Sequence, residues 1–272
     1  MSGPLDLLIL GGSGLLGTAL TEAADAAGLT WAATHLHADR SGTAWCRCDL
    51  TDHTAAVDLF NRLTPRAIVN AAYVQRGEAL PTLTAELPGV VAEWTAGRAR
   101  FVHLSSDIVF DGGLGRPYTE ADPPEPVNEY GAAKLDAEHR VLAADPDAVV
   151  VRTSLLWGGS GDGGPQLRLV RDPTVSFFTD EFRNPLDVDR LASACLELVE
   201  RPDITGVLHV AGPQRVDRLT FARALAPLAG VDPAGLRGDS GAEAPGRPAD
   251  VSLDSSLAAS VLTTELRGLP ER

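Results

Sequence analysis

The sequence predicts an α/β fold, a doubly wound parallel sheet of the Rossmann-like kind with a smaller C-terminal lobe. Apolar runs of strand length alternate with segments of helical periodicity over the first two thirds of its 272 residues. These runs are apolar almost throughout, which indicates strands that helices cover on both faces of a sheet. The first run, LDLLIL, leads directly into glycines that open a helix.

Strands are expected before residue 158 wherever a short apolar run ends in small or polar residues. Their ranges are 5–10, 30–34, 45–50, 67–72, 100–106 and 148–157. Helical periodicity covers 14–27 and 54–63, and Asn128 can cap a further helix behind the helix-breaking sequence DPPEP. Pro81 and Pro88 are expected to interrupt any long helix after the fourth strand.

The last third of the chain has a different organisation. We expect a helix at 188–200, a strand at 206–212, and helices at 219–230 and 254–262, with a Gly/Pro-rich segment near 230–248. The expected core is 1–157, to which 186–212 returns. The expected smaller lobe consists of 158–185 and 213–272, leaning over the carboxyl edge of the sheet.

Composition excludes several classes of partner. The formal net charge of −14 argues against nucleic acid or an anionic membrane surface. No stretch of about 18 apolar residues could span a bilayer, and the first apolar run lacks the positive region of a signal peptide. Cys46, Cys48 and Cys195 are too few for a disulfide framework, and the first two alternate as strand residues do. We therefore expect a cytoplasmic protein without a metal site.

Three glycines after the first strand indicate a cofactor. Gly11, Gly14 and Gly17 stand between a strand and a helix, where glycines permit a tight turn and close backbone approach to a pyrophosphate. The alternative is a plain glycine-rich turn. We expect the core to bind a dinucleotide and the lobe to bind a substrate. The expected cofactor-binding residues are Gly11, Ser13, Gly14, Leu15, Leu16, Gly17, His35, Arg40, Asp49, Leu50, Ala71, Ala72, Tyr73, Ser105, Tyr130 and Lys134.

The segment after the second strand, THLHADR, bears on the identity of the dinucleotide. An acidic residue there would bind the 2′-hydroxyl of the adenosine ribose, but the strand ends in His35 and Asp39 comes late. Arg40 is available for a 2′-phosphate, which favours NADPH and leaves NADH possible. The alternative is that these residues form a solvated loop. Asp49 ends the third strand, from where its side chain could reach the adenine.

The chain has a single lysine, Lys134, four residues after Tyr130, one of only three tyrosines. Residues four apart share a face of a helix, so the ammonium and the phenol should lie side by side. Ser105 and Ser106 end the fifth strand, on the sheet edge that also carries the glycine loop. Reduction of a carbonyl needs a hydride and a proton. A phenol can give the proton if a neighbouring cation lowers its pKa, and a serine hydroxyl can orient the substrate oxygen.

Together these features resemble the extended short-chain dehydrogenase/reductase superfamily and, more narrowly, the dTDP-4-dehydrorhamnose reductase family. The resemblance covers nearly the whole chain and is carried by HLSSDIVFDG (103–112), NEYGAAKLDAE (128–138), VVRTSLLWG (150–158), TDEFRNPLDVDRLA (179–192), GVLHVAG (206–212) and GRPADVSLD (246–254). It implies NADPH-dependent reduction of the 4-keto group of a nucleotide-linked 6-deoxysugar. By this resemblance Ser106, Tyr130 and Lys134 are the catalytic residues.

Departures from the family pattern bear on the substrate. Ile108 stands where an aromatic is usual, Leu155 where a tryptophan is usual, and Leu186 where a threonine is usual. Arg183 and Arg247 could clamp a diphosphate, or they could be ordinary surface arginines. The expected substrate-contacting residues are Asp107, Ile108, Tyr118, Leu155, Arg183 and Arg247.

Other functions stay open at this point. A redox-neutral epimerase or dehydratase of the same superfamily would keep its cofactor bound, and a reductase of a non-nucleotide ketone would use the same catalytic residues. A non-catalytic, NADP-binding regulatory subunit is a further alternative, because the β-subunit of methionine adenosyltransferase shares the resemblance. A small-molecule substrate is the expected partner, and a homodimer is possible.

Overall fold

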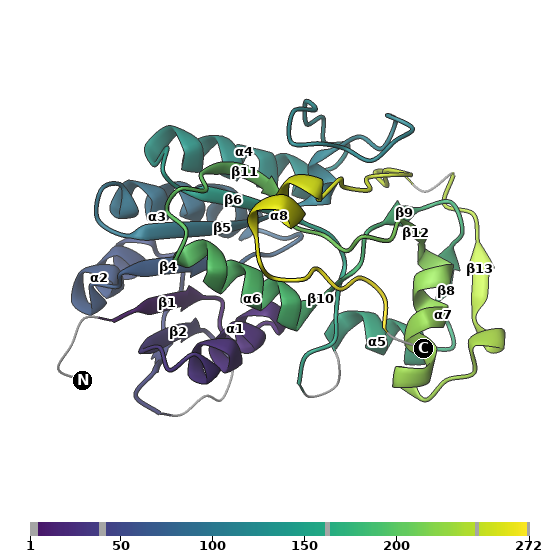
Figure 1. Ribbon diagram of the computed structural model, residues 1–272, viewed down its shortest axis with the longest axis horizontal. Coiled ribbons are helices and arrows are strands. Elements are labelled where there is room, and N and C mark those ends of the chain that lie inside the picture. The colour runs from purple at the N-terminus through teal and green to yellow at the C-terminus, as the bar shows by residue number, and fades with distance from the viewer. Residues whose placement is uncertain (1–4, 38–41, 161–163, 243–244, 271–272) are drawn as a thin grey trace.

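The computed structural model describes residues 5–37, 42–160, 164–242 and 245–270. Its centre is a seven-stranded sheet in the order β11-β6-β5-β4-β1-β2-β3, parallel throughout (Figure 1). The strands are β1 Leu7–Leu10, β2 Trp31–His35, β3 Trp45–Arg47, β4 Ala67–Asn70, β5 Arg100–Ser106, β6 Val149–Thr153 and β11 Gly206–His209. The predicted fold class is confirmed. Strand order reverses between β1 and β4, which is where ligands bind in open α/β sheets.

Helices cover both faces of this sheet. The helices α1 Leu15–Ala26 and α6 Val188–Val199 lie on one face. The helices α2 His53–Leu63, α3 Leu87–Thr95 and α4 Glu129–Ala144 lie on the other. Side chains of β1 alternate between the faces: Leu7 and Ile9 pack toward α1 and α6, whereas Leu8 and Leu10 pack toward α2 and α3. Because every residue of β1 is buried, a continuous apolar run is what such a central strand requires.

One expectation about local structure needs correction. The strand expected at 148–157 ends at Thr153, and β7 (Leu156–Trp157) pairs instead with β10 (Leu186–Asp187). The backbone amide of Leu186 donates to the Leu155 carbonyl oxygen at 2.8 Å, so a long-range pairing draws the chain away from the central sheet.

Pro81 and Pro88 were expected to interrupt any long helix after the fourth strand. They stand in the first turns of a π-helical segment, η1 Leu80–Glu86, and of α3, so the helical run changes its geometry between them and no single long α-helix forms there.

A smaller group of elements lies beside the sheet, on the right of Figure 1. It contains α5 Gly164–Arg171, β8 Ser176–Phe178, β9 Phe182–Arg183, β12 Val216–Asp217, α7 Arg218–Ala229, η3 Pro233–Gly235 and β13 Arg237–Asp239. Its own apolar cluster includes Leu167, Phe177 and Phe221. The helix α8, Ser256–Val261, packs differently: Ala258 belongs to the apolar cluster of α1 and α6. Residues near α8 therefore pack on the core, although the sequence grouped them with the lobe. None of the described helices is both long and apolar enough to cross a membrane.

Candidate active site

A cavity of about 760 Å³ lies along the carboxyl edge of the sheet. It is lined by the glycine loop, the ends of β2, β3, β4, β5 and β6, one face of α4 and the start of α5. The expected site residues that line it are Gly11, Ser13, Gly14, Leu15, Leu16, Gly17, His35, Asp49, Leu50, Ala71, Ala72, Tyr73, Ser105, Ser106, Asp107, Tyr130, Lys134 and Leu155. Arg40 lies outside the described residues. The structure thus collects in one cavity residues that are far apart in the sequence.

Three glycines of the loop, Gly11, Gly12 and Gly17, are packed so closely that a side chain would not fit. A Cβ on Gly17 would lie 2.2 Å from the carbonyl oxygen of Gly11, and Gly11 itself has a positive φ of 82°. The helix α1 begins directly behind the loop. Its N-cap residue is Gly14, which has no side chain to accept a hydrogen bond from the first amide groups of the helix. Free amide groups and the positive end of a helix dipole therefore face the cavity, which suits a pyrophosphate.

The far end of the cavity lies at the ends of β2 and β3. The carboxylate of Asp49 accepts hydrogen bonds from Thr51 Oγ1 at 2.6 Å and from the Thr51 amide at 3.0 Å. These two bonds hold the pKa of Asp49 below its ordinary value. His35 and His37 line the same end. Among the described residues, the buried Nδ1 of His35 has no hydrogen-bond partner. The buried Oγ1 of Thr153, at the opposite end of the cavity, has none either. Such atoms in a cavity wall are partners that a bound ligand can satisfy.

At the opposite end lies the group that the sequence predicted to be catalytic. The helix α4 begins at Glu129 because the Asn128 side chain accepts the amide of Gly131 at 2.8 Å, as expected of a cap. Lys134 is only 3% exposed, and its ammonium donates to the carbonyl oxygen of Leu104 at 2.8 Å. The same ammonium lies 5.1 Å from the centre of the Tyr73 ring.

The ring of Tyr130 stands beside these groups. Its centre lies 5.8 Å from that of the Tyr73 ring, and both Tyr130 and Ser106 line the cavity. Ser106 is the last residue of β5, and Tyr130 stands in the first turn of α4. A hydroxyl, a phenol and an ammonium therefore converge on one end of the cavity, where an acceptor oxygen could meet the first two.

The pKa of Tyr130 differs from the expectation. Burial raises the pKa of Tyr130 well above its usual value, Tyr73 and Asp107 raise it further, and the hydrogen bond with Ser106 lowers it. Lys134, whose ammonium donates to the Leu104 carbonyl oxygen, is not among the groups that shift the pKa of Tyr130, so the predicted lowering by a cation is absent. The proton is thus held firmly at neutral pH. Burial lowers the pKa of Lys134 from 10.5 to about 8, and Glu138 opposes this effect.

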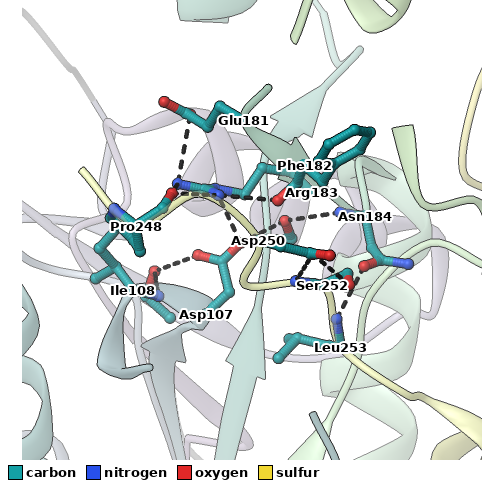
Figure 2. A network of polar contacts seen from close by, with 12 residues as sticks. Asp107, Ile108, Glu181, Phe182, Arg183, Asn184, Pro248, Asp250, Ser252 and Leu253 are labelled. Atoms are coloured by element: carbon teal, nitrogen blue, oxygen red, sulfur yellow. Dashed lines mark hydrogen bonds and ion pairs between the residues drawn. The ribbon is translucent and has the colours of Figure 1, made fainter. Parts of the chain in front are cut away.

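Asp107, which follows Ser106, lies beside Arg183 of the neighbouring lobe (Figure 2). Its carboxylate accepts hydrogen bonds from Ser106 Oγ at 3.1 Å and from Ser154 Oγ at 2.6 Å. The guanidinium of Arg183, which is 4% exposed, lies 3.7 Å from the same carboxylate. Burial raises the pKa of Asp107, whereas Arg183 and the hydrogen bonds from Ser154 and Ser106 lower it. The carboxylate therefore orients the Ser106 hydroxyl.

Four of the expected substrate residues do not line the cavity: Ile108, Tyr118, Arg183 and Arg247. Tyr118 is buried, stacks on Phe110 at 4.0 Å and donates its hydroxyl to Asp111. Arg183 and Arg247 share Glu181, at 3.3 Å and 2.8 Å. Other protein groups occupy the Tyr118 hydroxyl and pair with the guanidinium groups of Arg183 and Arg247, so substrate contact by these residues is a prediction without support from their position.

Several cavity residues were not expected. They are Thr34, Leu36, His37, Cys48, Thr51, Val74, Gln75, Ala79, Leu83, Leu104, Thr153, Ser154, Leu156, Pro165 and Gln166. Thr153 and Ser154 end a strand on the carboxyl edge, and this position could have identified them. Pro165 and Gln166 come from α5, whose approach to the cavity has no local signal. Within the described ranges, no group of three or more His, Cys, Asp or Glu side chains could hold a metal ion.

Comparisons with known proteins agree along the whole chain. Residues 5–270 match the profile described as RmlD substrate binding domain. The chain is 33% identical over 278 aligned residues to dTDP-4-dehydrorhamnose reductase of Mycolicibacterium smegmatis, covering 96% of this chain and 81% of the relative. It is 30% identical to methionine adenosyltransferase 2 subunit beta of Rattus norvegicus, covering 92% of this chain and 80% of the relative.

Solved structures have the same fold. A hypothetical dTDP-4-dehydrorhamnose reductase from Sulfolobus tokodaii superposes with a TM-score of 0.81 at 28% identity, covering 98% of each chain. The dTDP-4-dehydrorhamnose reductase of Bacillus anthracis, solved in complex with NADP, has a TM-score of 0.78 at 20% identity, covering 98% of this chain and 96% of that one.

Proposed function

This chain belongs to the family of the RmlD substrate binding domain, and from that premise we propose that it is an NADPH-dependent reductase of a nucleotide-linked sugar. The reaction proposed is reduction of the 4-keto group of a 6-deoxysugar attached to a nucleoside diphosphate. One observation carries the proposal most: Ser106, Tyr130 and Lys134 converge at one end of a cavity whose other wall is the glycine loop.

The cavity fits a dinucleotide on its own geometry. Gly11, Gly12 and Gly17 leave no room for side chains, and the uncapped end of α1 offers amide groups to a pyrophosphate. We assign the adenosine end to His35 and Asp49 and the nicotinamide end to Tyr73 and Lys134, which would hold the ribose hydroxyls. The bound cofactor would supply a hydride to the substrate carbonyl. NADPH is proposed over NADH because the end of β2 carries histidine rather than an acid.

The side chains at the nicotinamide end would handle the proton. Tyr130 is the proposed acid: its raised pKa keeps the phenol protonated at neutral pH, which is the form that can give a proton to a nascent alkoxide. Ser106 donates to Asp107 in this structure and would turn its hydroxyl proton to the substrate oxygen when a substrate binds. Lys134 would stabilise the phenolate that remains after the proton has left.

A regulatory role is the second candidate, favoured by the 30% identity to a methionine adenosyltransferase subunit. The purified protein is mixed with NADPH and a panel of nucleotide-linked 4-ketosugars and simple ketones. Loss of nicotinamide absorbance in proportion to product supports the reductase. Conversion without net oxidation of NADPH would indicate an epimerase or dehydratase. Inertness toward every probe, with a stoichiometric protein partner, would indicate the regulator.

We propose a cytoplasmic location from the state of the cysteines alone. Cys46, Cys48 and Cys195 are all free thiols, which suits a reducing cytoplasm. A homodimer stays a prediction, which light scattering of the purified protein would test.

A further inference from the structure

A buried ion pair lies one helical turn beyond Lys134. Glu138 is 2% exposed and Arg152 of β6 is 3% exposed. The guanidinium donates to the carboxylate through Nη2 at 2.7 Å and through Nε at 3.0 Å and 3.2 Å. It also lies 5.0 Å from the centre of the Phe110 ring, and its Nη1 is 3.5 Å from His209 Nε2. The geometry fixes the carboxylate of Glu138 in one orientation.

The carboxylate of Glu138 also reaches the strand that carries Ser106. The hydroxyl of Ser105 donates to Glu138 Oε1, and the preceding residue, Leu104, accepts the Lys134 ammonium. Two consecutive residues of β5 are thus bound by side chains from two consecutive turns of α4. The distance between the strand end and the helix, and with it the spacing of Ser106 from Lys134, depends on both bonds.

We propose that Glu138 and Arg152 are a positioning pair of the site: Glu138, held by Arg152, anchors Ser105 and supplies the negative charge that faces the Lys134 ammonium. The importance of this pair for catalysis rests on the proposed function. The contacts of Glu138 and its effect on Lys134 do not depend on it. Stability alone does not call for such a pair, because apolar side chains of similar volume often stabilise a core as well as a buried ion pair does.

The electrostatics around Lys134 support this assignment. Burial lowers the pKa of Lys134, and Glu138 is the charged group that raises it. The ionisable groups near it come from several elements: Tyr73 after β4, His103 on β5, Asp107 after β5, Tyr130 and Glu138 on α4, and Arg152 on β6. Burial and the Lys134 charge both lower the pKa of His103, so that ring is neutral. Glu138 therefore favours the charged form of Lys134, against the larger effect of burial.

The single lysine makes this directly measurable. Protein grown with lysine labelled at its ε-carbon gives one NMR signal, which belongs to Lys134 without further assignment. Its chemical shift is followed from about pH 6 to about pH 11, a range that includes the pKa of a buried and of a free lysine. We expect Glu138→Gln to lower the pKa of Lys134 by about one pH unit or more, whereas Glu138→Asp, which keeps the charge, should leave it nearer the wild-type value.

Two further variants secure the test. Asp136→Asn removes a carboxylate from the same helix that is exposed and paired with Arg140, and should leave the Lys134 titration unchanged. If Glu138→Gln fails to fold because Arg152 is left unpaired, the double variant Glu138→Gln/Arg152→Gln is used. It should lower the pKa of Lys134 by a smaller amount.

An unchanged Lys134 titration in a folded Glu138→Gln or double variant would overturn the proposal, as would an equal shift in Asp136→Asn. The titration needs neither cofactor nor substrate, so its failure is distinct from failure of the proposed reductase activity.

Discussion

Replacing Lys134 by methionine should stabilise the protein at neutral pH, although it removes the cation of the site. Burial lowers the pKa of Lys134 from 10.5 to about 8. One pKa unit is worth about 1.36 kcal/mol, so the buried charge costs the folded state ~3 kcal/mol. The hydrogen bond to the Leu104 carbonyl oxygen offsets about 1 kcal/mol of this. Methionine has a similar volume and no charge, so we expect a net gain of ~2 kcal/mol.

The stability advantage of Lys134→Met over wild type should become smaller as the pH rises. Below about pH 8 the folded and the unfolded wild-type protein both carry the proton, and the full cost is present. As the pH rises from about 8 toward 10.5, the folded state releases the proton while the unfolded state keeps it, so wild type gains stability relative to Lys134→Met. Urea unfolding of both proteins at about pH 7 and about pH 9.5 should show the difference shrinking by ~2 kcal/mol.

The matched control is Arg140→Met, which removes an exposed cation from the same helix. Its free energy of unfolding relative to wild type should not depend on pH in this range, because an exposed arginine keeps its proton throughout. The reasoning fails if Lys134→Met is less stable than wild type at neutral pH. It also fails if the stability difference is the same at both pH values, because the buried ammonium would then carry no cost.

Three other perturbations have definite expected outcomes. Gly17→Ala should raise the Kd for NADPH about tenfold or more in calorimetric titration, because its Cβ would lie 2.2 Å from the Gly11 carbonyl oxygen; unchanged affinity would exclude the glycine loop as the binding site. Tyr130→Phe and Lys134→Arg should fold normally by melting curve yet lose about two orders of magnitude or more in NADPH oxidation; near wild-type turnover in either would remove that residue from the mechanism. Arg40→Ala should weaken binding of NADPH more than of NADH, and equal effects on both would exclude contact with a 2′-phosphate.

The sheet could be predicted from the sequence because its signals are local. A buried parallel strand such as β1 reads as an apolar run with glycines behind it, whatever the rest of the chain does. The end of the strand at Thr153 could not be predicted in this way. It depends on the amide of Leu186, a residue distant in sequence, pairing with Leu155. For Pro88 the sequence does not distinguish a proline in the first turn of a helix, where it stands, from one in a helix interior.

In the candidate site, too, the residues that follow a local rule could be predicted and those that depend on tertiary packing could not. The strand-end rule places Gly14 and Ser106 on one edge of the sheet, and both line the cavity. Arg183 is paired with Asp107 and Glu181 and does not line the cavity. This pairing could not be predicted, because the two carboxylates are brought beside Arg183 only by tertiary packing (Figure 2). The direction of the Tyr130 pKa shift was missed likewise, because burial sets it and a local motif does not show burial.

Hydride transfer to a sugar carbon is the central claim, and isotope transfer measures it most directly. NADPH carrying deuterium at the transferable position of the nicotinamide is incubated with the purified protein and a nucleotide-linked 4-keto-6-deoxysugar, and the product is analysed by mass spectrometry and NMR. The account predicts a deuterium on the new carbinol carbon for each NADPH oxidised, and almost none formed in the same time by Tyr130→Phe. Product without deuterium, or a folded protein that binds NADPH yet leaves every such sugar unreduced, would contradict it.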